Sequence, residues 1–249
     1  MMNKKLIISK FRKIKDLGYI KSNRKHNTGI GKTFEDYIGV KENNIDEPDY
    51  VGYEIKAHRE LSQSYITLFT KSPSYPKGAN TYLRDKFGEL YPDNKNLKKL
   101  HTSFFANKRN SFASKYSFKL FNDKKEKKIY IEVYSLKDKK LLDNSCYYSY
   151  SDVSKIINNK LKNLFYVTAK TRKDSTGEEL FHYVSADMYE KPSFEKFLSL
   201  LDKGLIMYDI RIGSYKSGIN FGKTHDHGSG FRIRESNLTK LYSLHEKIE

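Results

Sequence analysis

The sequence predicts a mixed α/β fold of the α+β kind, with a mixed central β-sheet flanked by helices. Two observations support this prediction. Strand-like stretches such as residues 53–58 and 64–72 stand in groups, without the strict strand–helix alternation of a parallel fold. The length of 249 residues also suffices for one sizeable core, in two lobes or as two small domains. Tyr and Phe must supply much of this core, because hydrophobic residues make up only 37% and Trp is absent.

The first elements follow from apolar spacing and turn chemistry. Helical spacing of apolar residues predicts a helix over residues 3–18. The basic, glycine-containing stretch 21–32 is expected to be a loop. Thr33 would then cap a short helix, with Asp36 at the capping-box position.

The strand predictions rest on period-two alternation. Residues 53–58 alternate polar and apolar side chains, and residues 64–72 are typical of a buried strand, so the two are expected to form an antiparallel meander. The further elements expected are a helix in the later half of 72–89, a solvated turn at 123–128, a strand from Ile129, a helix from Ser151 to about Leu161, a strand at 164–170, a helix from near Ser193 to Gly204, and strands at 205–213 and 230–234.

The charge balance indicates a polyanionic partner. The net charge of +17 attracts polyanions. Nucleic acid is the commonest partner of this kind, and a membrane surface is the second. No stretch approaches the roughly 20 apolar residues of a membrane span, and the N-terminal apolar run is too short for a signal peptide. The lone Cys146 excludes a disulfide within the chain, argues against a cysteine-based zinc site, and fits a reducing cytoplasm.

The stretch DEPDYVGYEIKAH, residues 46–58, contains a candidate metal-dependent nuclease centre. On a strand, residues two apart share a face, so Glu54 and Lys56 would point one way and Ile55 into the core. Asp49 could join them from the preceding turn. Two converging carboxylates repel each other unless a divalent cation lies between them, and Mg²⁺ accepts one or two carboxylates with waters and phosphate oxygens. The lysine could then neutralise charge on the phosphate or orient a water.

A chance run of charges is the alternative explanation. An acid two residues before a lysine also occurs at Asp123, Glu126 and Asp138, in hydrophilic runs without an alternating strand. The case of Glu54 differs because it follows a turn and stands in an alternating stretch. Glu35, on a neighbouring helix, could add a ligand to the metal or its water.

Residues 208–234 predict a hairpin that contacts DNA bases. Asp209 and Arg211 would share one strand face, and Arg232 and Arg234 would share a face of the next strand. Arginine contacts guanine bidentately, and an acid can accept from cytosine N4. We therefore expect Arg211 and Arg232 to contact guanines and Asp209 a cytosine, with phosphate contact as the rival role for the arginines.

The loop of this hairpin and two lysines complete the candidate DNA-binding residues. His225, Asp226 and His227 would reach bases or phosphates from the loop end. An exposed loop with satisfied histidines is the alternative, and a zinc site is disfavoured because it needs four ligands. Lys32 is expected on a phosphate, and Lys71 on the backbone or in the minor groove.

Several blocks of the sequence together resemble a known family. NTGIGKTFEDYIG, EPDYVGYEIKAH, TLFTKSP, GAN and DIRIGSYKSG with GKTHDHGSGFRI follow in this order along the chain. They are similar to the MvaI/BcnI type of restriction endonuclease, whose fold resembles that of the mismatch-repair nickase MutH among the PD-(D/E)xK nucleases. The resemblance covers residues 23–84 and 205–234, and the middle is less distinctive.

The resemblance implies roles for the motif residues. Asp49 and Glu54 would hold Mg²⁺, Lys56 would be the catalytic lysine, and Glu35 a supporting acid. It also implies a monomer that nicks the two strands of double-stranded DNA in turn, at a short pseudopalindromic site of the CCNGG kind such as CCWGG.

The resemblance further implies two lobes around a DNA cleft, with a PD-(D/E)xK core of the MutH-like type. Residues 1–75 and 125–172 would form the catalytic lobe, and residues 76–124 and 173–249 the DNA-recognition lobe. A cognate DNA methyltransferase would be the functional companion, and no membrane partner is expected.

Two other functions stay open from the sequence. A MutH-like repair nickase would use the same active site but stop after one strand. A sequence-specific DNA-binding protein without catalysis would bind in a salt-sensitive way and cut nothing with Mg²⁺. An RNA-binding protein is weaker, because no aromatic-rich RNP motif or KH-type GxxG context is seen.

Overall fold

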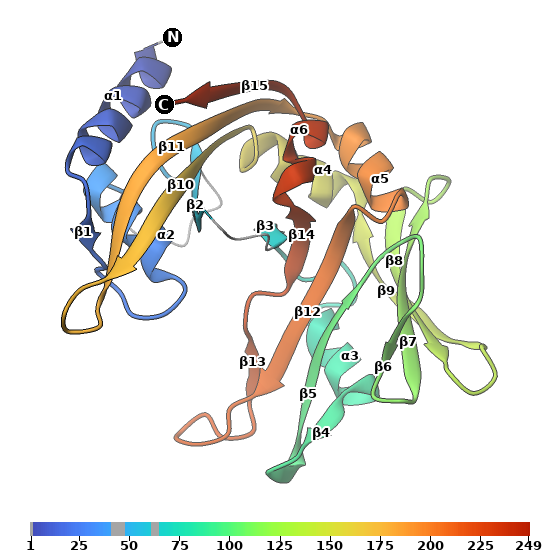
Figure 1. Cartoon of the computed structure of the whole chain (residues 1–249). Helices are drawn as coiled ribbons and strands as arrows, with labels where there is room; N and C mark the ends of the chain where they lie inside the picture. Colours follow the sequence, from blue (N-terminus) through green and yellow to red (C-terminus); the bar gives the residue numbers. More distant parts are fainter. Residues whose placement is uncertain (1, 41–47, 61–64) are drawn as a thin grey trace. The chain divides into compact units, whose positions relative to one another are not determined.

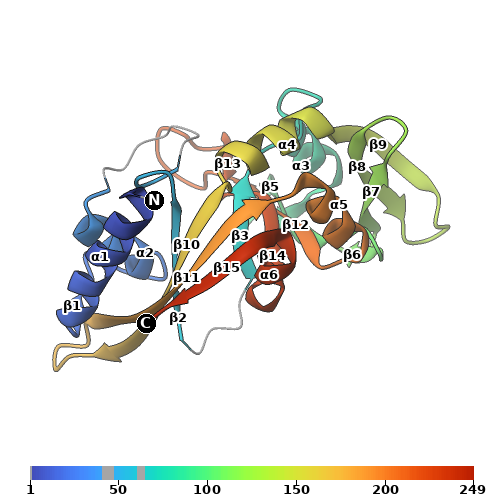
Figure 2. The ribbon, with the colours of Figure 1, turned by 90° about the horizontal axis from the view of Figure 1, so that it is seen from above.

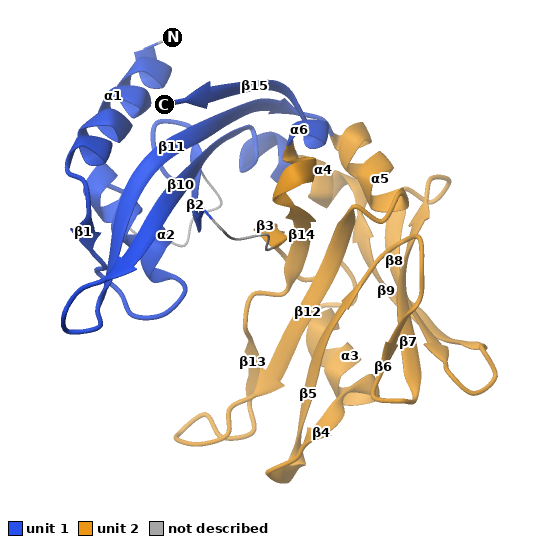
Figure 3. Ribbon diagram, viewed as in Figure 1, with its two compact units in different colours: residues 1–64, 156–193, 239–249 blue, residues 65–155, 194–238 orange. Residues whose placement is uncertain are grey.

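The computed structural model describes residues 2–40, 48–60 and 65–249 (Figure 1). The chain forms two compact units, coloured separately in Figure 3. Unit 1 comprises Met1–Ser64, Ile156–Ser193 and Thr239–Glu249, and unit 2 comprises Tyr65–Lys155 and Phe194–Leu238. Each unit combines helices with β-strands, so the predicted mixed α/β class is confirmed. Within the described residues, no helix has the length and apolar character needed to cross a membrane.

Unit 1 is built on a five-stranded mixed sheet (Figures 1 and 2). Strand β2 pairs with β10 in parallel, whereas β10–β11, β1–β11 and β11–β15 are antiparallel. The elements are α1 (Met2–Asp16), β1 (Ile20–Lys21), α2 (Gly29–Ile38), β2 (Glu54–Arg59), β10 (Asn163–Lys173), β11 (Glu179–Pro192) and β15 (Tyr242–Ile248).

Helices α1 and α2 pack against one face of this sheet. Their apolar side chains, including Phe11 and Phe34, share a core with Ile55, Phe165 and Val167 from the strands. Ile55 is only 3% exposed, as the alternation of residues 53–58 predicted. Because strand side chains alternate, Glu54 and Lys56 belong to the opposite face.

Two local predictions in unit 1 are wrong. Helix α2 begins at Gly29, within the predicted loop, with Thr28 as its N-cap and no side-chain cap. Thr33 therefore lies inside the helix, fully buried, and its Oγ1 accepts a hydrogen bond from the Asn23 backbone N–H at 2.9 Å. The hydroxyl thus serves the preceding loop, and the capping box with Asp36 does not form.

The predicted antiparallel meander is also wrong. Strand β2 pairs with β10, far along the chain, whereas β3 (Tyr65–Thr70) pairs with β14 (Gly230–Arg234) in another sheet. Alternation determines which face of a strand is buried, but it does not select the partner strand.

Unit 2 contains two sheets. The six-stranded sheet has the order β3–β14–β12–β5–β4, with β13 paired to β12, and the four-stranded sheet has the order β6–β7–β8–β9. Helix α3 lies against β5 and β12 (Figure 1). The further elements of the chain are α3 (Ala79–Phe87), β4 (Glu89–Tyr91), β5 (Asn94–Phe104), β6 (Asn110–Phe112), β7 (Tyr116–Asp123), β8 (Lys128–Ser135), β9 (Leu141–Ser149), α4 (Tyr150–Asn159), α5 (Phe194–Asp202), β12 (Ile206–Ser214), β13 (Thr224–Asp226), the short 3-10 helix Glu235–Asn237 and α6 (Leu238–Leu241). Of these, α4 is divided between the units, and α6 belongs mostly to unit 1.

Aromatic rings fill the core of unit 2. Phe104, Tyr148 and Phe231 surround Tyr208, with ring centroids 5.3–5.6 Å from that of Tyr208. All four side chains are fully buried. The expected reliance on Tyr and Phe is therefore met, and this core supports β12 from beneath its central residues.

The compact units divide the chain at other residues than the predicted lobes. Residues 125–155 belong to unit 2, and residues 173–193 belong to unit 1, where β11 completes the sheet around β10. The lobes were assigned by role, so the division into catalysis and recognition stays a prediction.

Candidate functional site

The three residues of the predicted catalytic motif lie together in unit 1. Strand β2 presents Glu54 and Lys56 on one face, and the Lys56 Nζ donates a hydrogen bond to Glu54 Oε1 at 3.0 Å. The backbone N–H of Ile55 donates to Asp49 Oδ2 at 2.8 Å. This bond ties the turn to the strand, so the Asp49 carboxylate is held beside the other two residues.

The two carboxylates fit a divalent cation. Glu54 is 4% exposed, and its Oε2 is buried without a hydrogen-bond partner among the described residues. An unpaired buried carboxylate oxygen is costly, and a cation beside it would remove that cost. Partial burial of the Asp49 carboxyl group, and secondly the nearby charge of Glu54, raise the pKa of Asp49. The residue as a whole is solvent-exposed, so a cation can reach it.

The role of Glu35 as a supporting acid stays a prediction. Glu35 is half-buried on α2, and its charge contributes, after burial, to raising the pKa of Tyr183. Across the described part of the chain, no three His, Cys, Asp or Glu side chains form a group able to hold a metal ion. Among the described residues, the candidate metal ligands are the two carboxylates of Asp49 and Glu54, a number that Mg²⁺ accepts.

The same sheet face carries a histidine that the sequence analysis missed. His58 follows Lys56 at the strand period, and its Nε2 hydrogen-bonds with Thr168 Oγ1 at 2.7 Å. Its ring stacks on Tyr166, the β10 residue opposite Lys56, with centroids 4.3 Å apart. Burial lowers the pKa of His58. The signal was present in the period-two spacing of residues 54, 56 and 58.

The predicted hairpin is present in unit 2, where β12 and β14 pair antiparallel. At the end of this pairing Asp209, 4% exposed, faces two arginines: Arg211 Nε donates to its Oδ2 at 2.5 Å, and Arg232 Nε lies 2.8 Å from the same oxygen. The Arg232 N–H makes no hydrogen bond there, so this second contact is an ion pair by proximity. Ser103 Oγ donates to the other Asp209 oxygen at 2.7 Å.

A pocket of about 600 Å³ opens beside this cluster. Strand β5 forms part of its wall, since Arg211 is paired in register with His101 and Asp209 with Ser103. The sequence did not predict this strand, and nothing in residues 94–104 shows which strand it pairs with. The lining residues are His101, Thr102, Ser103, Asp209, Arg211 and His227.

His227, which directly follows the short strand β13, lines this pocket, and His225 stands beside it on β13, a strand that the sequence did not predict. The His227 backbone N–H donates to the Arg211 carbonyl at 2.8 Å, and its ring centroid lies 5.9 Å from that of His101 and 4.0 Å from that of His225. His225 in turn stacks on Tyr215 at 4.3 Å. Burial lowers the pKa values of His101 and His227, which favours neutral rings able to donate and accept hydrogen bonds.

Asp226 is engaged within the loop. Its Oδ1 accepts from the backbone N–H groups of Gly228 and Ser229, and its Oδ2 accepts from Asn80 Nδ2 at 2.8 Å. These bonds shape the loop, so its expected contact with DNA stays a prediction.

The two predicted phosphate-binding lysines differ in their surroundings. Lys32 forms an ion pair with Asp36 at 2.8 Å along α2. Lys71 directly follows β3 and is exposed. Hydrogen bonds from Ser74 and Ser149 are the main cause of the lowered pKa of Asp152, and the charge of Lys71 adds to it.

Comparison with known proteins gives the family. Residues 8–242 match the model of the MvaI/BcnI restriction endonuclease family. The structure of restriction endonuclease MvaI in complex with cognate DNA substrate matches with a TM-score of 0.89 at 34% identity, over 98% of each chain. The structure of the same enzyme in the absence of DNA matches with a TM-score of 0.65 at 34% identity, over 100% of this chain and 98% of that one. Comparison with curated proteins gave no match. The chain therefore belongs to the MvaI/BcnI restriction endonuclease family and is a type II site-specific deoxyribonuclease.

Proposed function

We propose that this endonuclease uses Mg²⁺ to hydrolyse double-stranded DNA at a short pseudopalindromic site of the CCNGG kind, such as CCWGG. The observation that supports the metal most directly is the buried, unpartnered Oε2 of Glu54 beside Asp49 and Lys56. Enzymes of this family generally use a divalent metal ion. The structure of MvaI with its cognate DNA substrate supports DNA as the substrate of this chain.

Each residue of the motif has a distinct task in this proposal. Asp49 and Glu54 would hold the ion, which when bound supplies Lewis-acid polarisation and a water of lowered pKa. Lys56, kept in place by Glu54 Oε1, stabilises the charge that develops on the scissile phosphate or orients the attacking water. The Ile55 N–H keeps Asp49 oriented, and Glu35 assists as a supporting acid. Attack in line leaves 5′-phosphate and 3′-hydroxyl ends.

Site recognition is assigned to the pocket in unit 2. Arg211, Arg232 and Asp209 match a site rich in G·C pairs, because arginine reads guanine and a carboxylate accepts from cytosine N4. Since Asp209 Oδ2 already contacts both arginines, it also orients their guanidinium groups. The rings of His225 and His227 add hydrogen-bonding groups, and Asp226 holds their loop in shape.

The chain carries one such catalytic motif, so a monomer must cut the two strands in succession, with reorientation between the nicks. A cognate DNA methyltransferase would protect the host's own sites. We place the enzyme in the cytoplasm, which contains that DNA and whose reducing conditions fit the free Cys146 thiol.

The test is cleavage of supercoiled plasmid by the purified chain, with Mg²⁺ and with EDTA. We expect a nicked circle followed by discrete linear fragments, and sequencing of their ends names the site. Lys56→Ala should lose at least a thousandfold in cleavage rate while still binding the site. Lys125→Ala is the matched control, because it alters the same acid–residue–lysine pattern in the exposed turn after β7.

Each outcome separates the alternatives. A product that stops at the nicked circle would favour a repair-type nickase. Site-specific binding with no Mg²⁺-dependent cleavage of unmethylated, site-rich DNA would overturn the catalytic assignment.

A further inference from the structure

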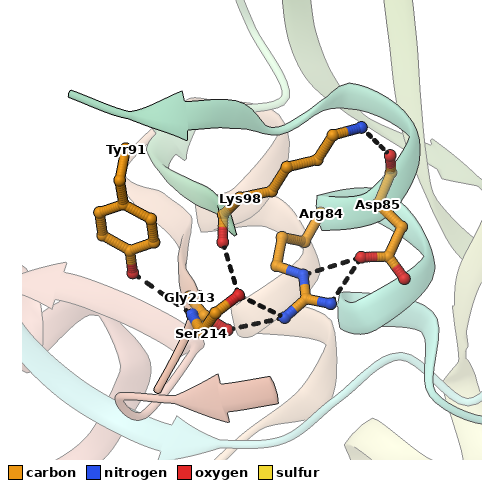
Figure 4. Close-up of polar contacts among 6 residues, drawn as sticks. All are labelled: Arg84, Asp85, Tyr91, Lys98, Gly213 and Ser214. Atoms are coloured by element: carbon orange, nitrogen blue, oxygen red, sulfur yellow. Dashed lines mark hydrogen bonds and ion pairs between the residues drawn. The ribbon is translucent and has the colours of Figure 1, made fainter. Parts of the chain in front are cut away.

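A buried arginine holds the far end of the strand that carries Arg211. Arg84, on α3, is 8% exposed and points at the end of β12 (Figure 4). Its Nη1 donates to the Gly213 carbonyl at 2.8 Å and lies 3.1 Å from Ser214 Oγ. Its Nε and Nη2 both donate to Asp85 Oδ1, at 2.9 and 2.6 Å, so each guanidinium nitrogen has a partner.

Two further strands grip the same pair of residues. The Ser214 N–H donates to the Tyr91 hydroxyl of β4 at 3.3 Å, and Ser214 Oγ donates to the Lys98 carbonyl of β5 at 3.0 Å (Figure 4). A Cβ atom on Gly213 would lie 2.2 Å from the Tyr91 hydroxyl oxygen, so any other residue there would force the Tyr91 side chain to shift. Gly213 and Ser214 are thus fixed by α3, β4 and β5 together.

Gly213 and Ser214 connect Arg211 on β12 with the loop histidines on and after β13. Gly213 follows Arg211 by one strand period and is paired in register with His225 of β13. The Arg211 carbonyl accepts from the His227 N–H. A shift of the backbone at Gly213 would therefore move Arg211 and both loop histidines together.

We propose that Arg84 is a positioning residue for sequence discrimination: by holding the Gly213 carbonyl and Ser214, it sets where Arg211 and His227 stand in the base-contacting pocket, and where His225 stands beside His227. The inference rests on the proposed recognition role of that pocket.

The chemistry explains why arginine occupies this position. A guanidinium offers five donors in a rigid planar arrangement, so it can bind a carbonyl, a hydroxyl and a carboxylate from one fixed position, which a lysine or an apolar side chain cannot do. Buried ionic groups are weak evidence for stability, since well-packed apolar residues often replace them without loss. Hydrogen bonds to base edges depend steeply on distance and angle, so a small displacement of Arg211 weakens contact with the cognate base pair most.

The experiment compares cleavage of the enzyme's own site with cleavage of the site altered at one base pair. In Arg84→Met we expect the ratio of the two kcat/KM values to fall at least tenfold, mainly through slower cleavage of the cognate site. Affinity for unrelated DNA, which depends on phosphate contacts, should change less than twofold. Ser214→Ala, a milder change that removes the two contacts of the Ser214 hydroxyl and keeps the bond from Arg84 to the Gly213 carbonyl, should lower the ratio in the same direction. Arg84→Lys should restore part of the ratio lost in Arg84→Met.

Lys86→Met and Tyr82→Phe are the matched controls. Both residues stand on α3, but their polar partner is Asp143 of β9, at 2.6 and 2.5 Å, and not β12. They should lower the midpoint of thermal unfolding to a similar extent and leave the ratio unchanged. If Arg84→Met and Ser214→Ala lose stability with an unchanged ratio, or if the controls lower the ratio equally, Arg84 is merely structural. Failure of the wild-type chain to prefer any site would instead overturn the proposed function.

Discussion

At the scale of single residues, the candidate site trades stability for function at Glu54. One carboxylate oxygen is held by Lys56, while the other is buried without a partner among the described residues. Folding alone gains little from this arrangement, because a half-satisfied buried charge is destabilising. Residues whose placement lowers the stability of the fold in this way are characteristic of binding and catalytic sites.

This leads to a prediction for Glu54→Gln. The variant should unfold in EDTA at the same temperature as the wild type or higher, because it removes a poorly solvated charge. Mg²⁺ or Ca²⁺ at ten times its dissociation constant should stabilise the wild type by about 1.4 kcal/mol and the variant hardly at all. Thermal unfolding with and without metal measures this, and Glu190→Gln, which alters another half-buried acid of unit 1, should keep the metal effect. Equal metal stabilisation of wild type and Glu54→Gln would count against the site.

At the scale of elements, local patterns predicted faces well and partners poorly. The period-two spacing of Glu54, Ile55 and Lys56 placed two of them on one face and one in the core, because the pleat alone determines this. The partner of β2 is β10, more than a hundred residues later, and no feature of either strand's own sequence specifies that pairing.

The base-contacting pocket illustrates the same limit. Asp209 and Arg211 were predicted from the β12 sequence, yet their neighbours His101 and Ser103 come from β5 and were missed. Thr33 shows a related failure: its hydroxyl satisfied a loop N–H from ten residues earlier, and the capping pattern could not reveal that contact.

The close approach at Gly213 makes an element-scale prediction. Gly213→Ala should destabilise the protein by about 1–3 kcal/mol, because the new Cβ would meet the Tyr91 hydroxyl at 2.2 Å. Tyr91→Phe removes that oxygen and should cost about 1 kcal/mol through the lost hydrogen bond with Ser214. The double variant should be less destabilised than the sum, since the ring carbon behind the hydroxyl would lie 3.5 Å from the new Cβ. A urea-unfolding cycle of the four proteins measures the coupling, and strict additivity would contradict it.

At the scale of the whole molecule, the net charge of +17 determines how the enzyme meets DNA before any base is contacted. Such a charge attracts duplex DNA from solution and releases condensed cations on binding, so non-specific affinity must fall with rising salt. Only lysines and arginines that reach phosphates contribute to this dependence. Those already paired within the protein add to the net charge but release fewer ions.

Lys71 and Lys32 allow this distinction to be measured. Lys71 is exposed, whereas Lys32 is ion-paired with Asp36 at 2.8 Å and its side chain is 20% exposed. In a Lys56→Ala background, which prevents cleavage, Lys71→Ala should reduce the slope of log affinity against log salt by about 0.9. Lys32→Ala should reduce it by less than half as much, because its charge is largely compensated before DNA arrives. The slopes can be obtained by fluorescence anisotropy with a labelled duplex at several salt concentrations. Equal slopes for Lys71→Ala and the background protein would remove Lys71 from the DNA interface, and a larger effect of Lys32→Ala would mean that DNA displaces Asp36 from this lysine.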